Sequence, residues 1–383
     1  MGDEMSGPAL LLLGFAVTRS AGAGSALLAG LTIAAAAGGP LFGAMLDRSR
    51  RPELVLAGGL AAYALGLGAI QVSVGKFPLL LVACLAALTG LSGPAVAGGW
   101  TSQLPRVVSR DALARCSALD ALTFDAASLA GPALAALTAA WAGARLAVAV
   151  AAVLVALAVP AACSLAPAPA DRASASRPEE PLRRQLAAGL TVIITRRALL
   201  RATVTSVVSC MGTGMLLVCC PVLGQQRLGA ASRGALLISA AAVVSLIANS
   251  VLARRPPRRP DTLVLASTLL LSLSMAAAAA APGWLTMLAV GFSGAGQGPQ
   301  LTGLLAVRHR ESPAAIRGQV FTTAASLKIG GLAAGTALAG LLAARSVTTC
   351  LLAAAGIQLA AAAAFLVLRA DTAPGAPGRT ACR

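Results

Sequence analysis

Residues 39–54 read GPLFGAMLDRSRRPEL, and this basic segment separates two long apolar stretches. Residues 20–46 before Asp47 carry no charged side chain, and neither do residues 54–75 after it. A stretch of about 20 apolar residues is long enough to cross a bilayer as a helix. The segment therefore predicts a loop between two membrane-spanning helices, and the rest of the chain repeats this pattern.

The composition also indicates a membrane protein. Only 11% of the 383 residues are charged and 57% are hydrophobic, whereas soluble domains have about a quarter charged residues. This excludes a disordered chain, a coiled coil, collagen and a disulfide-rich secreted module. The net charge of +17 is typical of nucleic-acid binders. Because the basic residues lie in short clusters between apolar stretches, we expect a lipid bilayer and no nucleic acid as the partner.

Residues that would mark an enzyme or a metal site are scarce. His309 is the single histidine and the eight cysteines form no C-x-x-C pair, so we expect no metal and no cofactor. The chain has no Walker motif, no HExxH and no GxSxG, which argues against an ATP-driven pump and against a membrane enzyme. Asp3 and Glu4 stand where a signal peptide would be basic, so we expect the first helix to be retained.

Twelve membrane-spanning helices are predicted. The charge-free stretches are residues 5–18, 20–46, 54–75, 77–105, 126–144, 146–170, 202–226, 234–253, 262–307, 329–344 and 346–368. Pro282-Gly283 divides the longest one into helices over 262–281 and 284–307. Helices over 116–141 and 315–343 are expected to carry charges inside. The stretch over residues 5–18 is short for a span. We expect that the first helix continues past Arg19, that a very tight turn joins it to the second helix, or that the chain begins further upstream. The alternative is a protein with eleven spans.

The basic residues predict the orientation. Of the 30 lysines and arginines, 23 fall on one side of the predicted helices, six fall on the other, and Lys328 lies inside a helix. Because cytoplasmic loops carry the excess of basic residues, we expect both termini in the cytoplasm and an even number of spans. We expect a multi-pass protein of the inner (plasma) membrane.

A polar segment divides the chain into two halves. Residues 167–200 begin with an Ala/Pro/Ser-rich linker and end in a predicted amphipathic helix on the inner membrane face, with Leu182, Leu186, Leu190, Ile193 and Ile194 at helical spacing. We therefore predict an N-terminal six-helix bundle over 1–166, a C-terminal one over 201–369 and a cytoplasmic tail over 370–383.

The halves also resemble each other. Residues 90–137 align with 291–341, so that Gly90, Ser92 and Gly93 fall on Gly291, Ser293 and Gly294. Arg115 falls near Arg317. Repeated six-helix units with a site between them are typical of one large transporter architecture.

The segment over 39–54 resembles the loop motif G-x-x-x-D-R-x-G-R-R of the major facilitator superfamily. Gly43, Asp47, Arg48 and Arg51 match the motif, while Arg50 replaces its second glycine. The resemblance implies an all-α fold of twelve transmembrane helices in two pseudo-symmetric six-helix bundles. It also implies that the four matching residues form a gating loop, since an aspartate beside arginines at helix ends can hold one gate conformation.

Gly131-Pro132 resembles half of the G-P-x-x-G-G signature of drug–proton antiporters in that superfamily. Ala135 and Ala136 replace its last two glycines. The resemblance implies an efflux protein with a helix hinge here, although a purely structural kink is equally compatible with a Gly-Pro pair. The arginine that efflux members carry in the fourth helix has no match, and the first helix is expected to lack a buried acid.

Ionisable residues inside membrane helices are functional candidates because they are costly there. Asp125 and Lys328 are expected at similar depths near the midplane, Asp125 as a proton carrier or as half of an ion pair with Lys328. A static interhelical pair is the alternative. Asp120 is expected nearer the cytoplasmic end, where it packs or caps. Uncharged candidates for the substrate cavity are Trp100, Gln103, Ser209, Thr213, Gln297 and Gln300.

Together these features predict a monomeric secondary transporter that works by alternating access. We expect it to export a small organic solute, with protons as the candidate coupling ion. A non-transporting scaffold or receptor of the same architecture is the alternative.

Overall fold

The computed structural model describes residues 1–19, 21–109, 112–165, 182–230, 233–343 and 345–370. Over these residues the chain is helical, with one isolated bridge between Val74 and Phe77. The first half contains α1 (Gly2–Thr18), α2 (Ala21–Arg48), α3 (Pro52–Ser73), α4 (Leu79–Gly90), η1 (Ala95–Gly99), α5 (Trp100–Ser102), α6 (Leu104–Val107), α7 (Leu113–Ala142), α8 (Ala144–Ala156) and α9 (Ala158–Cys163). The second half contains α11 (Leu182–Thr195), α12 (Arg197–Leu228), α13 (Gly234–Arg254), α14 (Pro260–Ala280), α15 (Leu285–Glu311), η3 (Ala314–Ile316), α16 (Arg317–Ala343) and α17 (Val347–Ala370).

These helices make twelve spans across the described ranges. Nine stretches are long and apolar enough to cross a membrane, and one of them, Leu113–Cys163, contains both α7 and the α8–α9 helix beyond the turn at Gly143. The other two spans are α1, which has 17 residues, and α15, which has 27. The predicted twelve-helix fold is confirmed, and the eleven-span alternative is wrong.

The first two helices are joined by a very tight turn, as one of the sequence alternatives proposed. Arg19 adopts a left-handed conformation with a φ of 58°, and its backbone N–H donates to the carbonyl of Phe15. Gly14 and Gly24 lie so close together that a β carbon on either would meet the other helix's backbone. The short helix α1 can therefore turn back directly onto α2.

The span predicted over residues 77–105 is not one regular helix. It ends as α4 at Gly90, continues through a π-helical turn at Ala95–Gly99, and finishes in the short helices α5 and α6. Glycine and proline weaken a regular helix, and this segment reads GLSGPAVAGG. The interruption brings Gly98 against the backbone of Phe321 and Thr322 on α16, in the other half of the chain.

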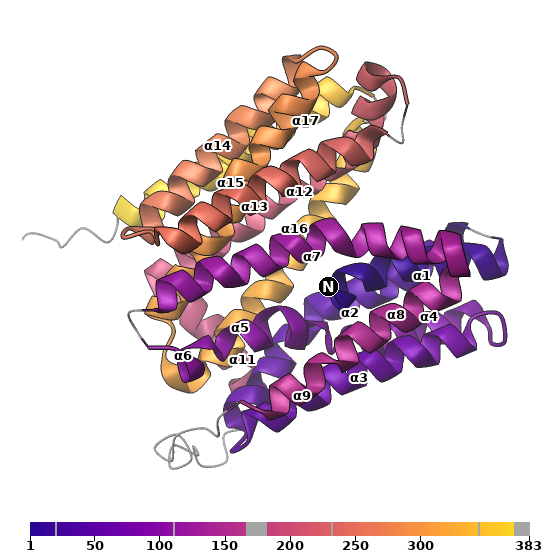
Figure 1. The fold of residues 1–383 in the computed structure, drawn as a ribbon. Helices are drawn as coiled ribbons and strands as arrows, with labels where there is room; N and C mark the ends of the chain where they lie inside the picture. Colours follow the sequence, from indigo (N-terminus) through magenta and orange to yellow (C-terminus); the bar gives the residue numbers. More distant parts are fainter. Residues whose placement is uncertain (20, 110–111, 166–181, 231–232, 344, 371–383) are drawn as a thin grey trace, which may run out of the picture.

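Two groups of helices make up the molecule (Figure 1). The first group is α1 to α9 and the second is α12 to α17, and α2–α16 and α7–α13 contacts join them. The groups meet near α6 and α11 and diverge away from them (Figure 1). We call the end of the molecule where α11 lies the α11 end. The second group begins at Arg197, four residues before the predicted boundary at 201.

The outer surface is apolar, as a bilayer requires. Trp141 and Leu80 are 85% and 75% exposed, whereas Tyr63 and Phe321 are each only 2% exposed. An exposed apolar band is stable only against lipid, because water would disfavour it. The helices therefore bury some of their apolar residues against each other and present the remainder to the membrane.

The predicted amphipathic helix is present as α11, over Leu182–Thr195. Ile193 is buried against Leu199 on α12 and Val320 on α16, while Ile194 is exposed. One side of α11 thus packs on the helix bundle, where the sequence had suggested only a membrane surface. The linker residues 167–181 and the predicted tail after residue 370 lie outside the described residues.

Candidate functional site: a polar cavity between the two helix groups

A cavity of about 250 Å³ lies between the two groups of helices. Its wall comes from α1 and α7 on one side and from α12, α13, α15 and α16 on the other. The lining residues are Glu4, Phe124, Asp125, Ser128, Thr213, Leu216, Leu217, Cys220, Ile238, Ala241, Ala242, Ser245, Val290, Gln297, Leu301 and Lys328. A concave site with a largely apolar wall and a few convergent polar groups suits a small organic molecule.

Three charged side chains line the cavity. Asp125 and Lys328 face it from opposite groups of helices, and Glu4 joins them from α1. The Lys328 ammonium interacts electrostatically with both carboxylates. In the described part of the chain, neither carboxylate forms an ion pair with it within 4.0 Å. The cavity therefore holds two acids and one base that are close but not locked together.

The expectation that the first helix lacks a buried acid is wrong. In the sequence, Glu4 reads as part of a polar start before the apolar run. In the structure α1 already begins at Gly2, and its first turn packs against α7 at Gly131. A β carbon on Gly131 would lie 2.8 Å from the β carbon of Glu4, so only glycine allows this approach. The glycine of the Gly-Pro pair thus positions Glu4.

Asp125 is held by a side chain that the sequence analysis did not single out. The Asn249 amide on α13 donates to the Asp125 carboxylate over 2.6 Å, and its carbonyl oxygen accepts from Thr302 over 2.9 Å. The second bond fixes which way the amide points. Asn249 is the only asparagine in the chain and lies in an apolar stretch, which was the available signal.

The predicted cavity residues on α12 and α15 fall into two sets. Thr213 and Gln297 line the cavity. Gln300 instead donates to the hydroxyls of Ser209, over 3.0 Å, and Thr268, over 2.7 Å. Ser209 and Gln300 therefore join α12, α14 and α15 inside the second group of helices, and neither is part of the cavity wall.

The predicted residues on and near α5 lie away from the cavity wall. Trp100 packs against the hydrophobic core of the first group of helices. Gln103 is buried and accepts a 2.8 Å hydrogen bond from Arg106. Asp120 accepts a 2.7 Å hydrogen bond from the Thr101 hydroxyl. These contacts lie within one group of helices, as expected of packing residues.

Asp47 joins the two groups at the α11 end. Its carboxylate accepts hydrogen bonds from the backbone N–H groups of Gly318, over 2.8 Å, and Gln319, over 2.7 Å. These donors belong to the first turn of α16, where free N–H groups and the helix dipole favour a negative charge. Of the other predicted gating residues, Gly43 is buried against α16, and Arg48 and Arg51 are exposed.

Small residues continue this contact along α2 and α16. The Thr322 hydroxyl donates to the carbonyl of Gly39 over 2.7 Å, and the Ser326 hydroxyl donates to that of Ala35 over 2.7 Å. A side chain on Gly39 or Gly43 would overlap α16. The glycines let the two backbones approach, and the hydroxyls then join them.

An apolar plug closes the cavity toward the α11 end. It consists of Ala121 on α7, Leu301 and Leu305 on α15, and Phe321 on α16. Leu301 also lines the cavity, so the plug begins at the cavity wall. Because its members come from both groups of helices, separation of the groups at this end would open the plug.

The predicted hinge at Gly131-Pro132 does not break the helix. α7 runs without interruption from Leu113 to Ala142 through Pro132. A proline inside a helix removes one backbone hydrogen bond. A hinge function therefore stays a prediction, while the close packing at Gly131 is a feature of the structure.

Comparison with known proteins gives a family and a fold. The sequence model of the Major Facilitator Superfamily matches residues 1–321. The human organic anion transporter MFSD10 (TETRAN) superimposes with a TM-score of 0.74 at 18% identity, over 95% of this chain and 97% of the other. A bacterial homologue of the iron transporter ferroportin, in its outward-facing state, gives 0.70 at 14% identity, over 96% and 97%. No curated protein matches the chain significantly.

Proposed function

Because the chain belongs to the Major Facilitator Superfamily, we propose that it is a secondary transporter that moves a small organic solute by alternating access. The single observation that carries this proposal is the cavity between the two groups of helices, with charged residues from both groups on its wall. A solute bound there contacts both groups at once, so its binding is coupled to their relative movement.

The direction that we propose is export. The excess of basic residues at the α11 end predicts that this end faces the cytoplasm. Asp47 and the apolar plug close the α11 end. With the proposed orientation, this would be the state that is closed to the cytoplasm. An exporter would release its solute from this state and reload once the α11 end has opened.

The coupling ion that we propose is the proton. Asp125 and Glu4 both line the cavity, and its wall also carries Lys328. When both carboxylates are ionised, the three charges give the cavity a net charge of −1, and protonation of both leaves Lys328 as the only charge. Protons and solute can therefore alternate in the same cavity, because each state of charge favours a different occupant.

The test is transport into inverted membrane vesicles with an imposed pH gradient, across a panel of antibiotics, sugars and amino acids. We expect a gradient-dependent flux of at least one solute, and we expect Asp125→Asn to abolish it while the protein still folds in the membrane. Asp120→Asn is the matched control, because Asp120 lies off the cavity wall. Unchanged gradient-driven flux with Asp125→Asn would reject proton coupling through this residue, and a flux that ignores every gradient would reject secondary transport.

A further inference from the structure

Among the described residues, a buried arginine near the α11 end forms no ion pair. Arg308 on α15 is only 4% exposed, and within the described ranges its Nε and Nη2 atoms meet no hydrogen-bond acceptor. Burial of a guanidinium without a partner destabilises the folded chain, so such a group is rarely retained for stability. A group of this kind is a candidate for binding something that the folded chain does not supply.

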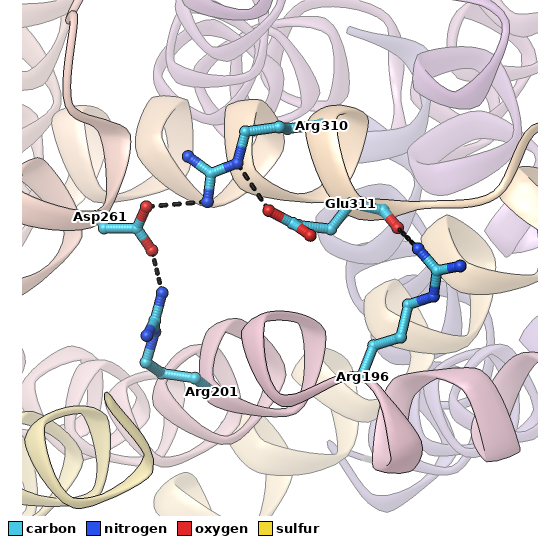
Figure 2. A network of polar contacts seen from close by, with 5 residues as sticks. All are labelled: Arg196, Arg201, Asp261, Arg310 and Glu311. Atoms are coloured by element: carbon cyan, nitrogen blue, oxygen red, sulfur yellow. Dashed lines mark hydrogen bonds and ion pairs between the residues drawn. The ribbon is translucent and has the colours of Figure 1, made fainter. Parts of the chain in front are cut away.

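The nearby acids are bound to other arginines. Figure 2 shows Asp261 between Arg201 and Arg310, and Glu311 bonded to Arg310. The Arg310–Asp261 distance is 2.8 Å and the Arg310–Glu311 distance is 2.7 Å. Because these carboxylates already have basic partners, neither neutralises Arg308.

In the first half of the chain, the residue that corresponds to Arg308 in the internal repeat is Arg106, and it forms an ion pair. Arg106 precedes Arg115 by the same spacing with which Arg308 precedes Arg317, and these pairs align in the internal repeat. Arg106 forms an ion pair of 3.4 Å with Glu53, at the start of α3. Asp261 stands at the equivalent start of α14, where RRPD repeats RRPE. It pairs with Arg201 and Arg310 instead.

Other buried polar groups at this end of the second group of helices also have no hydrogen-bond partner in the described structure. Both ring nitrogens of His309 are buried and without a hydrogen-bond partner in the described structure. Its ring packs against Phe321 with 4.5 Å between the ring centroids and a tilt of 40°. On α12, the hydroxyls of Thr203 and Ser206 are likewise buried without a partner. Ser206 follows Thr203 by three residues and precedes Thr213 by seven, so the three side chains share one face of α12. Thr213 lines the cavity, and the other two lie nearer the α11 end.

We propose that Arg308 and His309 form a binding site for the anionic group of an organic substrate, a carboxylate or a sulfonate. The site lies beyond the plug, between Phe321 and the α11 end, so it becomes accessible when that end opens. Arg308 supplies charged N–H donors and His309 a further donor, which is the arrangement that binds an oxyanion. This inference rests on the proposed function for its route, in which the anion passes from Arg308 to Lys328 in the cavity.

The experiment compares 1-naphthoate with 1-naphthamide, which have nearly the same shape and differ in charge. Their intrinsic fluorescence reports binding to the purified full-length protein by equilibrium dialysis. We expect the wild type to bind naphthoate more tightly than naphthamide. We expect Arg308→Gln to weaken naphthoate binding by about tenfold or more, because it removes a charge-assisted interaction, and to leave naphthamide binding unchanged. His309→Phe, which keeps the ring beside Phe321, should weaken naphthoate binding to a smaller degree.

Arg255→Gln is the matched control, because it removes an exposed positive charge from the same end of the molecule. Removal of an unpaired buried charge should also leave the empty protein at least as thermally stable as the wild type. The proposal is overturned if the wild type does not prefer naphthoate, if Arg308→Gln keeps the preference, or if Arg255→Gln loses it equally. Binding is measured without a gradient or a membrane, so failure of proton-coupled transport would not affect this result.

Discussion

Replacement of Asp47 by asparagine should open the α11 end. The carboxylate accepts two backbone hydrogen bonds from the first turn of α16, from Gly318 over 2.8 Å and from Gln319 over 2.7 Å. Asparagine keeps one acceptor oxygen but loses the charge. The loss is one charge-assisted hydrogen bond, about 1.5–3 kcal/mol, and part of the helix-dipole attraction, about 0.3–1 kcal/mol.

We therefore expect Asp47→Asn to shift the equilibrium toward the open α11 end by about 2–3 kcal/mol, which is a factor of about 30–150. Cys210 is a suitable reporter. It is buried and lies on the α12 face of Thr213, closer to the α11 end. In a chain whose other seven cysteines are replaced by alanine, the rate of maleimide labelling from the α11 side measures how often that end opens.

The control is Arg50→Gln, which changes an exposed charge in the same loop and should leave the labelling rate at the wild-type value. The reasoning is refuted if Asp47→Asn, correctly folded in the membrane, labels within about twofold of the wild type, since that corresponds to less than about 0.5 kcal/mol.

Three further substitutions test the contacts of the structure. Gly298→Ala should lower the free energy of unfolding by about 1–3 kcal/mol, because the added β carbon would lie 2.6 Å from the Asn249 amide nitrogen. Gly330→Ala is the control, because a β carbon there meets open space and should leave stability unchanged. Equal unfolding midpoints for the two variants would contradict the packing at Gly298. Arg227→Met should lower the unfolding midpoint, because the guanidinium donates to the carbonyls of Ala278, Ala279 and Ala281 at the end of α14; an unchanged midpoint would show these bonds to be unimportant. Glu53→Gln should lower the free energy of unfolding by about 1.5–3 kcal/mol, because it removes the charge-assisted contact of 3.4 Å with Arg106, which keeps its hydrogen bond to Gln103. Detergent unfolding measures this, and a loss below about 0.5 kcal/mol would show that the ion pair contributes little.

The helices could be predicted because bilayer physics acts on each segment separately. Every span must carry about 20 apolar residues whatever its neighbours are, so the stretch over 262–307 could be divided correctly at Pro282-Gly283. The break after Gly90 was not predicted, because glycine and proline are also tolerated inside membrane helices when a neighbour takes up the free backbone groups. Here α16 approaches that break at Gly98.

The cavity was predicted only in part, because it depends on which helices meet. Asp125 and Lys328 could be found as charges inside apolar stretches. Glu4 was missed because its position in the sequence resembles a polar chain start, and only the contact of Gly131 with α1 places it in the cavity. Ser209 and Gln300 were predicted to line the cavity, but they are hydrogen-bonded to each other inside the second group of helices.

The Arg308 site shows a different limit. In the sequence, Arg308 and His309 are two members of a basic cluster at the end of an apolar stretch, which the positive-inside rule alone would explain. Only the pairing of Arg310 with Asp261 and Glu311 reveals that, in the described structure, Arg308 has no acidic partner while its neighbour in the cluster does. Ion pairing depends on side-chain geometry, which a linear sequence does not contain.

The most direct test of alternating access is the distance between the two groups of helices at both ends of the molecule. Spin labels at Arg50 and Ala315 report on the α11 end, and labels at Lys76 and Arg345 report on the opposite end; all four positions are exposed. In bilayers at acidic and at alkaline pH, we expect a second population in which the first distance is longer and the second is shorter. A single distance at each end under all conditions, or two ends that lengthen together, would contradict the account.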